Sequence, residues 1–218
     1  MRSFVATLVK TLFPPATLAK SLFPPLVLAA ALAAQAAPGL LPSDSVYQLE
    51  APLTDQSGRR MTLAAKRGNP QLVVMFYTSC KFICPTIIDT VLDLDRKLTP
   101  AERQRFGVLL VSLDAQRDDP GALKALADQR GLDLARWTLA QPQPADVRAI
   151  AGVLGVRYRV LADGEFNHTG VLVLLDADGR IVSRSTKTSG TVDTQFMDRI
   201  RSALAAPRST FPTAPRSP

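Results

Sequence analysis

The sequence predicts an α/β domain in which buried strands alternate with amphipathic helices. Two continuous apolar runs, LVVMFY at 72–77 and VLLVSL at 108–113, have the length and composition of strands that are buried on both faces. Each run is followed by a helical pattern of apolar residues, and turn signals separate the segments. The content of 46% hydrophobic and 21% charged residues excludes a disordered chain, and two cysteines are too few for a disulfide scaffold.

The elements can be followed along the chain from their ends. The predicted strands and helices are, in order, a hairpin at 53–63, a strand at 72–77, a helix that ends before 99–100, a strand at 108–113, a helix at 119–131, a strand at 137–140, a helix from about 145 to 155, a hairpin at 171–185 and a helix at about 192–205. Asp119-Pro120 opens one helix, because Pro suits the first helical position, and Gly131 closes it. The turn Ala177-Asp178-Gly179 joins the two strands of the last hairpin.

Strand, helix, strand and helix, followed by a hairpin and a final helix, is the element order of a thioredoxin-like fold with a central mixed sheet. An N-terminal β-hairpin and one extra helix would decorate that core. We expect this domain to cover residues 44–206. The 207–218 tail has four prolines in twelve residues and is predicted to be disordered.

The N-terminal segment 1–36 is predicted to be a signal peptide or an N-terminal anchor. The first 43 residues contain no acid, and an apolar run at 26–34 leads into AQA, which has the small-x-small form of a signal-peptidase site after Ala36. We therefore expect an exported, periplasmic protein that is soluble or anchored to the inner membrane. The chain has a net charge of +7, but it contains no basic run with interleaved aromatic residues, so we expect no nucleic-acid partner.

The chemistry-bearing residues are few, and two of them lie close together. Cys80 and Cys84 frame CKFIC, after a buried strand and at the start of a helix, which is where α/β sheets place their ligands. The helix N-terminus and Lys81 are predicted to lower the pKa of these thiols. The spacing leaves three interpretations open: a structural disulfide, a redox pair and a metal-binding pair.

His168 is the single histidine of the chain, and it precedes the strand at 171–176. It is either a histidine of a surface loop or a third member of the cysteine site. In a thioredoxin-like sheet this strand would run antiparallel to the one at 72–77, so its beginning would lie at the edge where the cysteines are. Two thiolates and an imidazole form a soft ligand set that suits copper, in particular Cu(I), whereas zinc would need a fourth ligand. Met75 is a soft side chain too, but its apolar run indicates a core position.

Three segments in this order, FYTSCKFICPTI, VSLDAQRDDP and FNHTGVLVLLDADGRI, resemble the Sco/SenC family of copper-binding, thioredoxin-like proteins. The resemblance covers about residues 47–205. It implies that Cys80, Cys84 and His168 bind copper as Cu(I) or Cu(II). It also implies delivery of copper to, or reduction of, the binuclear copper centre of cytochrome c oxidase subunit II, at a periplasmic or membrane-anchored location.

Asp114 and Arg117 resemble the aspartate motif that ends a strand in this family. Asp114 would contact the site or a partner, or it would only form a turn or cap a helix. The sequence leaves three functions open: a copper chaperone, a thiol-disulfide oxidoreductase that reduces client cysteines with Cys80 and Cys84, and a copper- or redox-sensing protein. Whether the chain is an enzyme therefore also stays open. A peroxiredoxin is disfavoured, because the Pro-x-x-x-Thr-x-x-Cys signature is absent before Cys80.

Overall fold

The computed structural model describes residues 40–189 and 193–206. A seven-stranded sheet forms the centre of this part, with the strand order β2-β1-β5-β4-β3-β8-β9, and two further strands, β6 and β7, form a small sheet of their own. β3, β4 and β5 run parallel, whereas β1, β8 and β9 are antiparallel to their neighbours. The predicted α/β, thioredoxin-like fold with a central mixed sheet is thereby confirmed.

The elements have the following bounds. The strands are β1 Leu53–Asp55, β2 Arg60–Met61, β3 Gln71–Phe76, β4 Gly107–Ser112, β5 Trp137–Pro142, β6 Tyr158–Val160, β7 Phe166–His168, β8 Leu172–Leu175 and β9 Ile181–Ser185. The α-helices are α1 Ile83–Arg96, α2 Pro100–Arg103, α3 Pro120–Gln129, α4 Val147–Leu154 and α5 Thr194–Ala205. Two short 3₁₀ helices, Val46–Gln48 and Leu63–Lys66, lie before β3.

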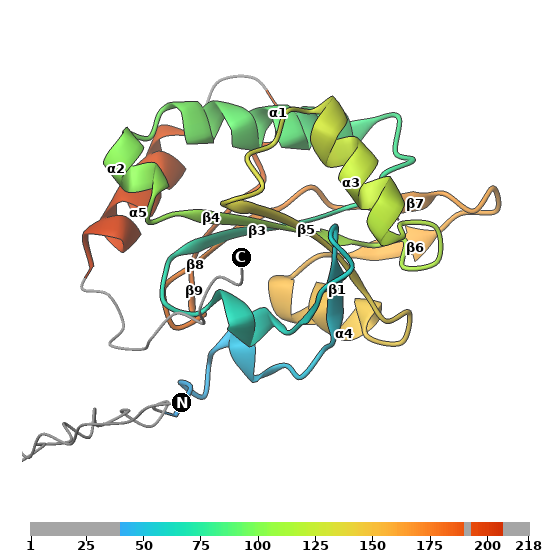
Figure 1. Cartoon of the computed structure of the whole chain (residues 1–218), viewed down its shortest axis with the longest axis horizontal. Coiled ribbons are helices and arrows are strands. Elements are labelled where there is room, and N and C mark those ends of the chain that lie inside the picture. The colour runs from blue at the N-terminus through green and yellow to red at the C-terminus, as the bar shows by residue number, and fades with distance from the viewer. Residues whose placement is uncertain (1–39, 190–192, 207–218) are drawn as a thin grey trace, which may run out of the picture. The chain divides into compact units, whose positions relative to one another are not determined.

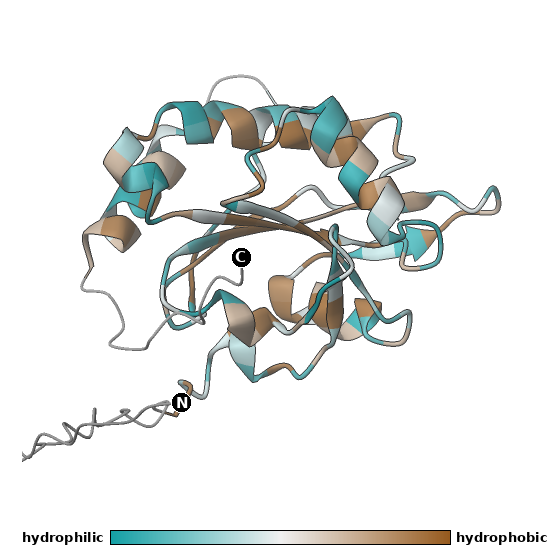
Figure 2. Ribbon diagram, viewed as in Figure 1, coloured by the Kyte–Doolittle hydropathy of each residue, from teal (hydrophilic) through white to brown (hydrophobic). Residues whose placement is uncertain are grey.

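Helices cover both faces of the central sheet (Figure 1). α1, α3 and α5 lie on one face, and α4 lies on the other together with the short N-terminal helices. Every residue of β3 and of β4 is buried as a result, which is why the sequence of these strands is a continuous apolar run rather than an alternating one. Figure 2 shows these central strands coloured mostly as hydrophobic.

The core is filled by large side chains from the strands and the helices. Phe76 and Trp137 are at most 1% exposed, and Phe196 is 2% exposed. Burying a side chain of this size contributes about 1.5–3 kcal/mol. Met75, 2% exposed in β3, belongs to this core, so its apolar interpretation holds.

Several predicted helix ends agree with the structure, whereas others differ from it. Asp119 caps α3 by accepting a hydrogen bond from the backbone N–H of Ala122 at 2.8 Å, with Pro120 at the first helical position. α4 begins at Val147, two residues after the prediction, and ends at Gly155, whose φ of 74° closes the helix in the left-handed conformation. The N-terminal hairpin is more than a decoration, because β1 pairs antiparallel with β5 and extends the central sheet.

Besides the two 3₁₀ helices, the sequence did not predict α2 and the β6–β7 hairpin. α2 is a single helical turn whose capping box joins Thr99 and Glu102. The β6–β7 hairpin is too short, and too rich in charge around its tip, to give a strand pattern.

The predicted signal peptide or anchor at 1–36 and the predicted tail at 207–218 lie outside the described residues. Among the residues that are described, no helix combines the length and the hydropathy that crossing a bilayer requires.

Candidate metal centre

Three elements meet where the three predicted side chains lie. β3 ends at Phe76, and a short loop carries Cys80 to the start of α1, in whose first turn Cys84 lies. β8 runs antiparallel to β3 and pairs Leu172 with Val74, so the chain just before β8 lies at the edge where β3 ends. His168 occupies that place, as the last residue of β7.

The structure brings Cys80, Cys84 and His168 into one group. Their ligand atoms all lie within 4.8 Å of one another. Cys84 Sγ is 3.5 Å from His168 Nε2, and the backbone N–H of Cys84 donates to Cys80 Sγ at 3.5 Å. Both cysteines are free and buried, and His168 is only 9% exposed. The histidine is therefore not a surface-loop residue.

The imidazole of His168 is oriented by its second nitrogen. Nδ1 lies 3.3 Å from the carbonyl oxygen of Thr169, so a proton on Nδ1 can be donated to that oxygen. This tautomer leaves the lone pair of Nε2 directed at Cys84 Sγ, which is the usual arrangement of a metal-binding histidine. Burial lowers the pKa of His168 below its ordinary value, and the neutral form that binds metal is thereby favoured.

The two thiols differ in acidity. Burial acts to raise the pKa of Cys80, but hydrogen bonds from the backbone N–H groups of Cys84 and Phe82 outweigh it, and the pKa of Cys80 falls below its usual range. Burial raises the pKa of Cys84, and the neighbouring Cys80 raises it further. The prediction of a lowered thiol pKa is therefore right for Cys80 and wrong for Cys84, because desolvation exceeds the effect of the helix N-terminus there.

Tyr77 connects the histidine to the cysteine loop. Its ring meets the His168 ring edge-on, with centroids 5.9 Å apart, and packs against Phe166 at 5.2 Å. Its hydroxyl donates to the backbone carbonyl of Phe166 at 3.3 Å. The sequence did not identify Tyr77 as part of the site, because the residue ends an apolar run, and that run indicates a core position.

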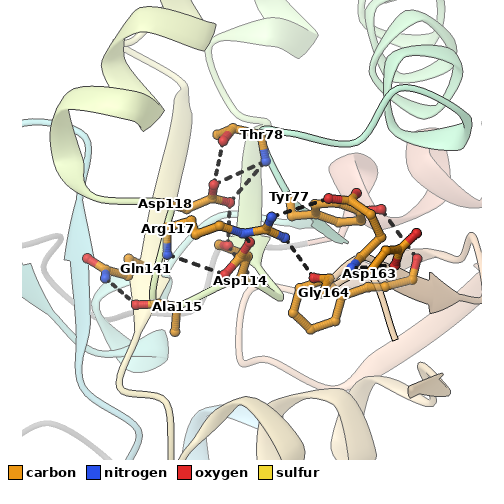
Figure 3. Close-up of polar contacts among 12 residues, drawn as sticks. Tyr77, Thr78, Asp114, Ala115, Arg117, Asp118, Gln141, Asp163 and Gly164 are labelled. Carbon is orange, nitrogen blue, oxygen red and sulfur yellow. Dashed lines mark hydrogen bonds and ion pairs between the residues drawn. The ribbon is translucent and has the colours of Figure 1, made fainter. Parts of the chain in front are cut away.

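A buried carboxylate fixes the start of the cysteine loop (Figure 3). Asp118 accepts hydrogen bonds from the backbone N–H of Thr78 at 3.0 Å, from the Thr78 hydroxyl, and from the Ser112 hydroxyl at 2.5 Å. Burial raises the pKa of Asp118 despite these bonds. The sequence motif indicated Asp114 instead, and the repeated acids in VSLDAQRDDP are the signal that points to Asp118 as well.

Asp114 and Arg117 lie at the same sheet edge but not in the ligand group. The Asp114 carboxylate binds the guanidinium of Arg117 in an ion pair. Arg117 also reaches Glu165 at 3.2 Å and the carbonyl of Gly164 at 2.9 Å, both in the turn between β6 and β7. The pair therefore bridges the loop after β4 and the hairpin that carries His168.

Access to the thiols is open on one side. A cavity of about 170 Å³ lies between α1 and α3, with both cysteines in its wall. Lys81 is exposed, and Phe82 is 83% exposed, which is unusual for a large apolar side chain. The loop thus presents an aromatic ring to solvent beside a buried thiol.

The donor set fits copper. Two sulfur ligands and one neutral imidazole are soft donors, and they suit Cu(I). In the described part of the chain, no further Cys, His, Asp or Glu belongs to the group, so the four protein ligands of a structural zinc site are not assembled there.

The chain resembles known proteins over most of this domain. The family model described as SCO1/SenC matches residues 45–205. A SCO1 protein homolog from Bacillus subtilis (strain 168) is 24% identical over 162 residues, which cover 72% of this chain and 83% of that protein.

Solved structures give the same picture. Bradyrhizobium japonicum ScoI, solved with copper bound, has 25% sequence identity and a TM-score of 0.57, covering 70% of this chain and 96% of that one. A SCO1/SenC family lipoprotein from Bacillus anthracis str. Ames has 20% identity and a TM-score of 0.64, covering 71% of this chain and 94% of that one.

Proposed function

This chain belongs to the SCO1/SenC family, and we propose that it is a copper chaperone that binds copper through Cys80, Cys84 and His168 and passes it to a copper-accepting protein. The observation that carries the proposal is the convergence of the three ligand atoms within 4.8 Å of one another, although 84 residues separate Cys84 from His168. The donor set supports copper as the cargo, as does the copper bound in ScoI of Bradyrhizobium japonicum.

The proposed client is the binuclear copper centre of cytochrome c oxidase subunit II, reached in the periplasm. The family resemblance of the cysteine and histidine segments supports this client, and the export-type segment at 1–36 supports the compartment. The protein would be released from the membrane or stay anchored to its outer side, according to whether that segment is cleaved.

A three-ligand site suits delivery better than storage. Cu(I) accepts a low coordination number, so a thiol or imidazole of the client can add to the ion before Cys80, Cys84 or His168 leaves. Copper then moves by ligand exchange, with no change of oxidation state. The cavity beside the two thiols provides the room for an incoming ligand.

The proposal is tested by the copper content and affinity of the reduced, purified full chain. We expect equimolar copper in the parent protein and a loss of binding in both Cys80→Ser and Cys84→Ser. His168→Ala should weaken Cu(II) binding by at least about tenfold. Met75→Leu is the matched control, because it removes a soft sulfur from the core without a large change in volume and should retain copper. Full copper binding in Cys80→Ser would refute the assigned site.

The client is tested separately. Copper-loaded protein is mixed with the copper-free soluble domain of oxidase subunit II, and copper in each is measured after separation. Transfer is expected to the intact domain and not to a domain whose copper-binding cysteines are replaced by serine. Retention of all copper by the chaperone would leave the metal site standing and refute this client.

A second candidate function is thiol-disulfide exchange with client cysteines, and the unequal acidity of the two thiols favours it. The Cys80 thiolate would attack a client disulfide, forming a mixed disulfide and releasing one client thiolate. Cys84, once deprotonated, would then attack Cys80, so that the client leaves as a dithiol and Cys80–Cys84 becomes a disulfide. Each further turnover needs an external dithiol reductant. His168→Ala should leave this activity intact while it weakens copper binding, which separates the two functions.

A further inference from the structure

The element that carries His168 stands apart from the central sheet. β6 and β7 pair only with each other, with Tyr158 opposite His168 and Val160 opposite Phe166. The ligand is therefore at the end of a two-stranded hairpin that no central strand extends. Its position depends on the contacts that the hairpin makes with the rest of the domain.

The packing beneath this hairpin is incomplete. A cavity of about 510 Å³ lies under it, and the apolar side chains of Tyr158, Val160 and Phe166 form one of its walls. Leu113 and Val147 line the same cavity from the central part of the domain. Because a cavity removes the contacts that would fix the hairpin through close packing, directional polar bonds matter more for its placement.

One side chain supplies those bonds at the tip of the hairpin (Figure 3). Arg117 donates to the Gly164 carbonyl at 2.9 Å and to the Glu165 carboxylate at 3.2 Å. Gly164 has a φ of 80° in the tight turn at this tip, so its carbonyl direction is set by the turn. The third partner of Arg117 is Asp114, which is 4% exposed and fixed by a bond from its own N–H to the Ser112 hydroxyl at 2.9 Å.

From this arrangement we propose that Arg117 is a positioning residue for the copper ligand His168: it fastens the β6–β7 hairpin to the loop after β4 and so holds the imidazole within reach of the two thiols. Asp114 orients the guanidinium, and the hairpin transmits its position to the ring. This inference rests on the proposed copper site and adds a residue that touches neither the ion nor its ligands. A planar guanidinium can serve three oxygen atoms at once, which a lysine ammonium on a flexible stem does less well.

The proposal is tested with a double-mutant cycle on copper-loaded full chain. Arg117→Ala should weaken Cu(II) affinity by about tenfold, as loss of a group that orients a ligand typically does. In the His168→Ala background the same substitution should change the affinity by less than about twofold, because the ligand through which it acts is already gone. Arg117→Lys should fall between Ala and the parent protein. Arg159→Ala is the matched control, since it removes an arginine charge from the hairpin that Arg117 fastens.

Arg159 is exposed, and within residues 40–189 and 193–206 its side chain makes no hydrogen bond or ion pair. The substitution Arg159→Ala should therefore leave the Cu(II) affinity unchanged. In the electron paramagnetic resonance spectrum of the Cu(II) form, Arg117→Ala should reduce the nitrogen coupling that reports the imidazole, a change that mere loss of stability does not produce.

Two outcomes would overturn the inference and leave the copper site intact. In the first, Arg117→Ala lowers the copper affinity equally with and without His168. In the second, Arg117→Ala leaves the copper affinity unchanged although His168→Ala weakens it. If His168→Ala itself binds copper like the parent protein, the proposed ligand set fails, and the positioning role fails with it.

Discussion

The cysteine half and the histidine half of the metal centre are held by different kinds of contact. The cysteine loop is fastened by Asp118, which is fully buried and accepts bonds from Thr78 and Ser112. The histidine hairpin is fastened at its tip by Arg117, whose side chain is 45% exposed. Bonds that are shielded from water are stronger and more costly to leave unmade than bonds that water can replace.

This difference suits the proposed copper chaperone, which would both hold an ion and give it up. A rigid pair of thiols would retain the copper, while a ligand on a separately fastened hairpin could withdraw without disturbing the core. Segments with few buried contacts open at a lower free energy than the core does. We therefore expect His168 to be the first ligand to yield when a client approaches.

The largest expected effect comes from breaking the buried fastening. Asp118→Ala leaves the Thr78 N–H without an acceptor in the interior and should lower the free energy of unfolding by about 2–4 kcal/mol. The free energy is measured by urea denaturation of the copper-free protein. Asp119→Ala is the neighbouring control, since it removes only the cap of α3 and should cost about 1 kcal/mol.

The same experiment on the other half should give a much smaller result. Arg117→Ala removes partly exposed bonds, and it should cost about 1 kcal/mol or less in the copper-free protein. Equal costs for Asp118→Ala and Arg117→Ala would contradict the comparison between a rigid and an adjustable half.

A second prediction concerns the two thiols within the rigid half. Because the pKa of Cys80 lies below its usual range and that of Cys84 above it, Cys80 holds more thiolate at neutral pH, and its rate of alkylation should fall only as the pH drops through that lowered pKa. At pH 7 we expect Cys80 to react with iodoacetamide at least about tenfold faster than Cys84. Peptide mapping by mass spectrometry after short exposures measures both rates. Equal rates, or faster labelling of Cys84, would contradict the difference in acidity between the two thiols.

The sequence predicted the rigid half better than the adjustable one. The central strands, the helix after CKFIC and the cap at Asp119 all follow from local patterns: continuous apolar runs, helical spacing and a Pro at the first helical position. The nearness of His168 to the cysteines follows from the antiparallel pairing of β8 with β3, which a thioredoxin-like order already implies.

The remaining features depend on tertiary contacts that no local sequence pattern predicts. β6 and β7 are three residues each and include Arg159 and Asn167, so their apolar alternation is too short to detect. The choice of Asp118 over Asp114 as the anchor of the cysteine loop depends on which carboxylate points toward Thr78. The raised pKa of Cys84 depends on burial, which overrides the favourable position at a helix N-terminus.

The smallest expected effect is at the surface of the rigid half, where Phe82 projects beside Cys80 with 83% of its area exposed. Exposed aromatic side chains often carry much of the binding energy of an interface, so we expect Phe82 to contact the client during transfer. Phe82→Ala keeps the backbone N–H that bonds to Cys80 and should leave copper affinity unchanged, while it slows transfer to the acceptor domain about fivefold. Stopped-flow mixing of copper-loaded protein with the acceptor measures the rate. Val182→Ala, at an exposed apolar position on β9, is the control.

A weakened copper affinity in Phe82→Ala would mean that the ring protects the ion rather than contacting a client. An unchanged transfer rate would mean that the client docks elsewhere, and the histidine hairpin would then be the next surface to probe, since it is the other half of the centre that a client can reach.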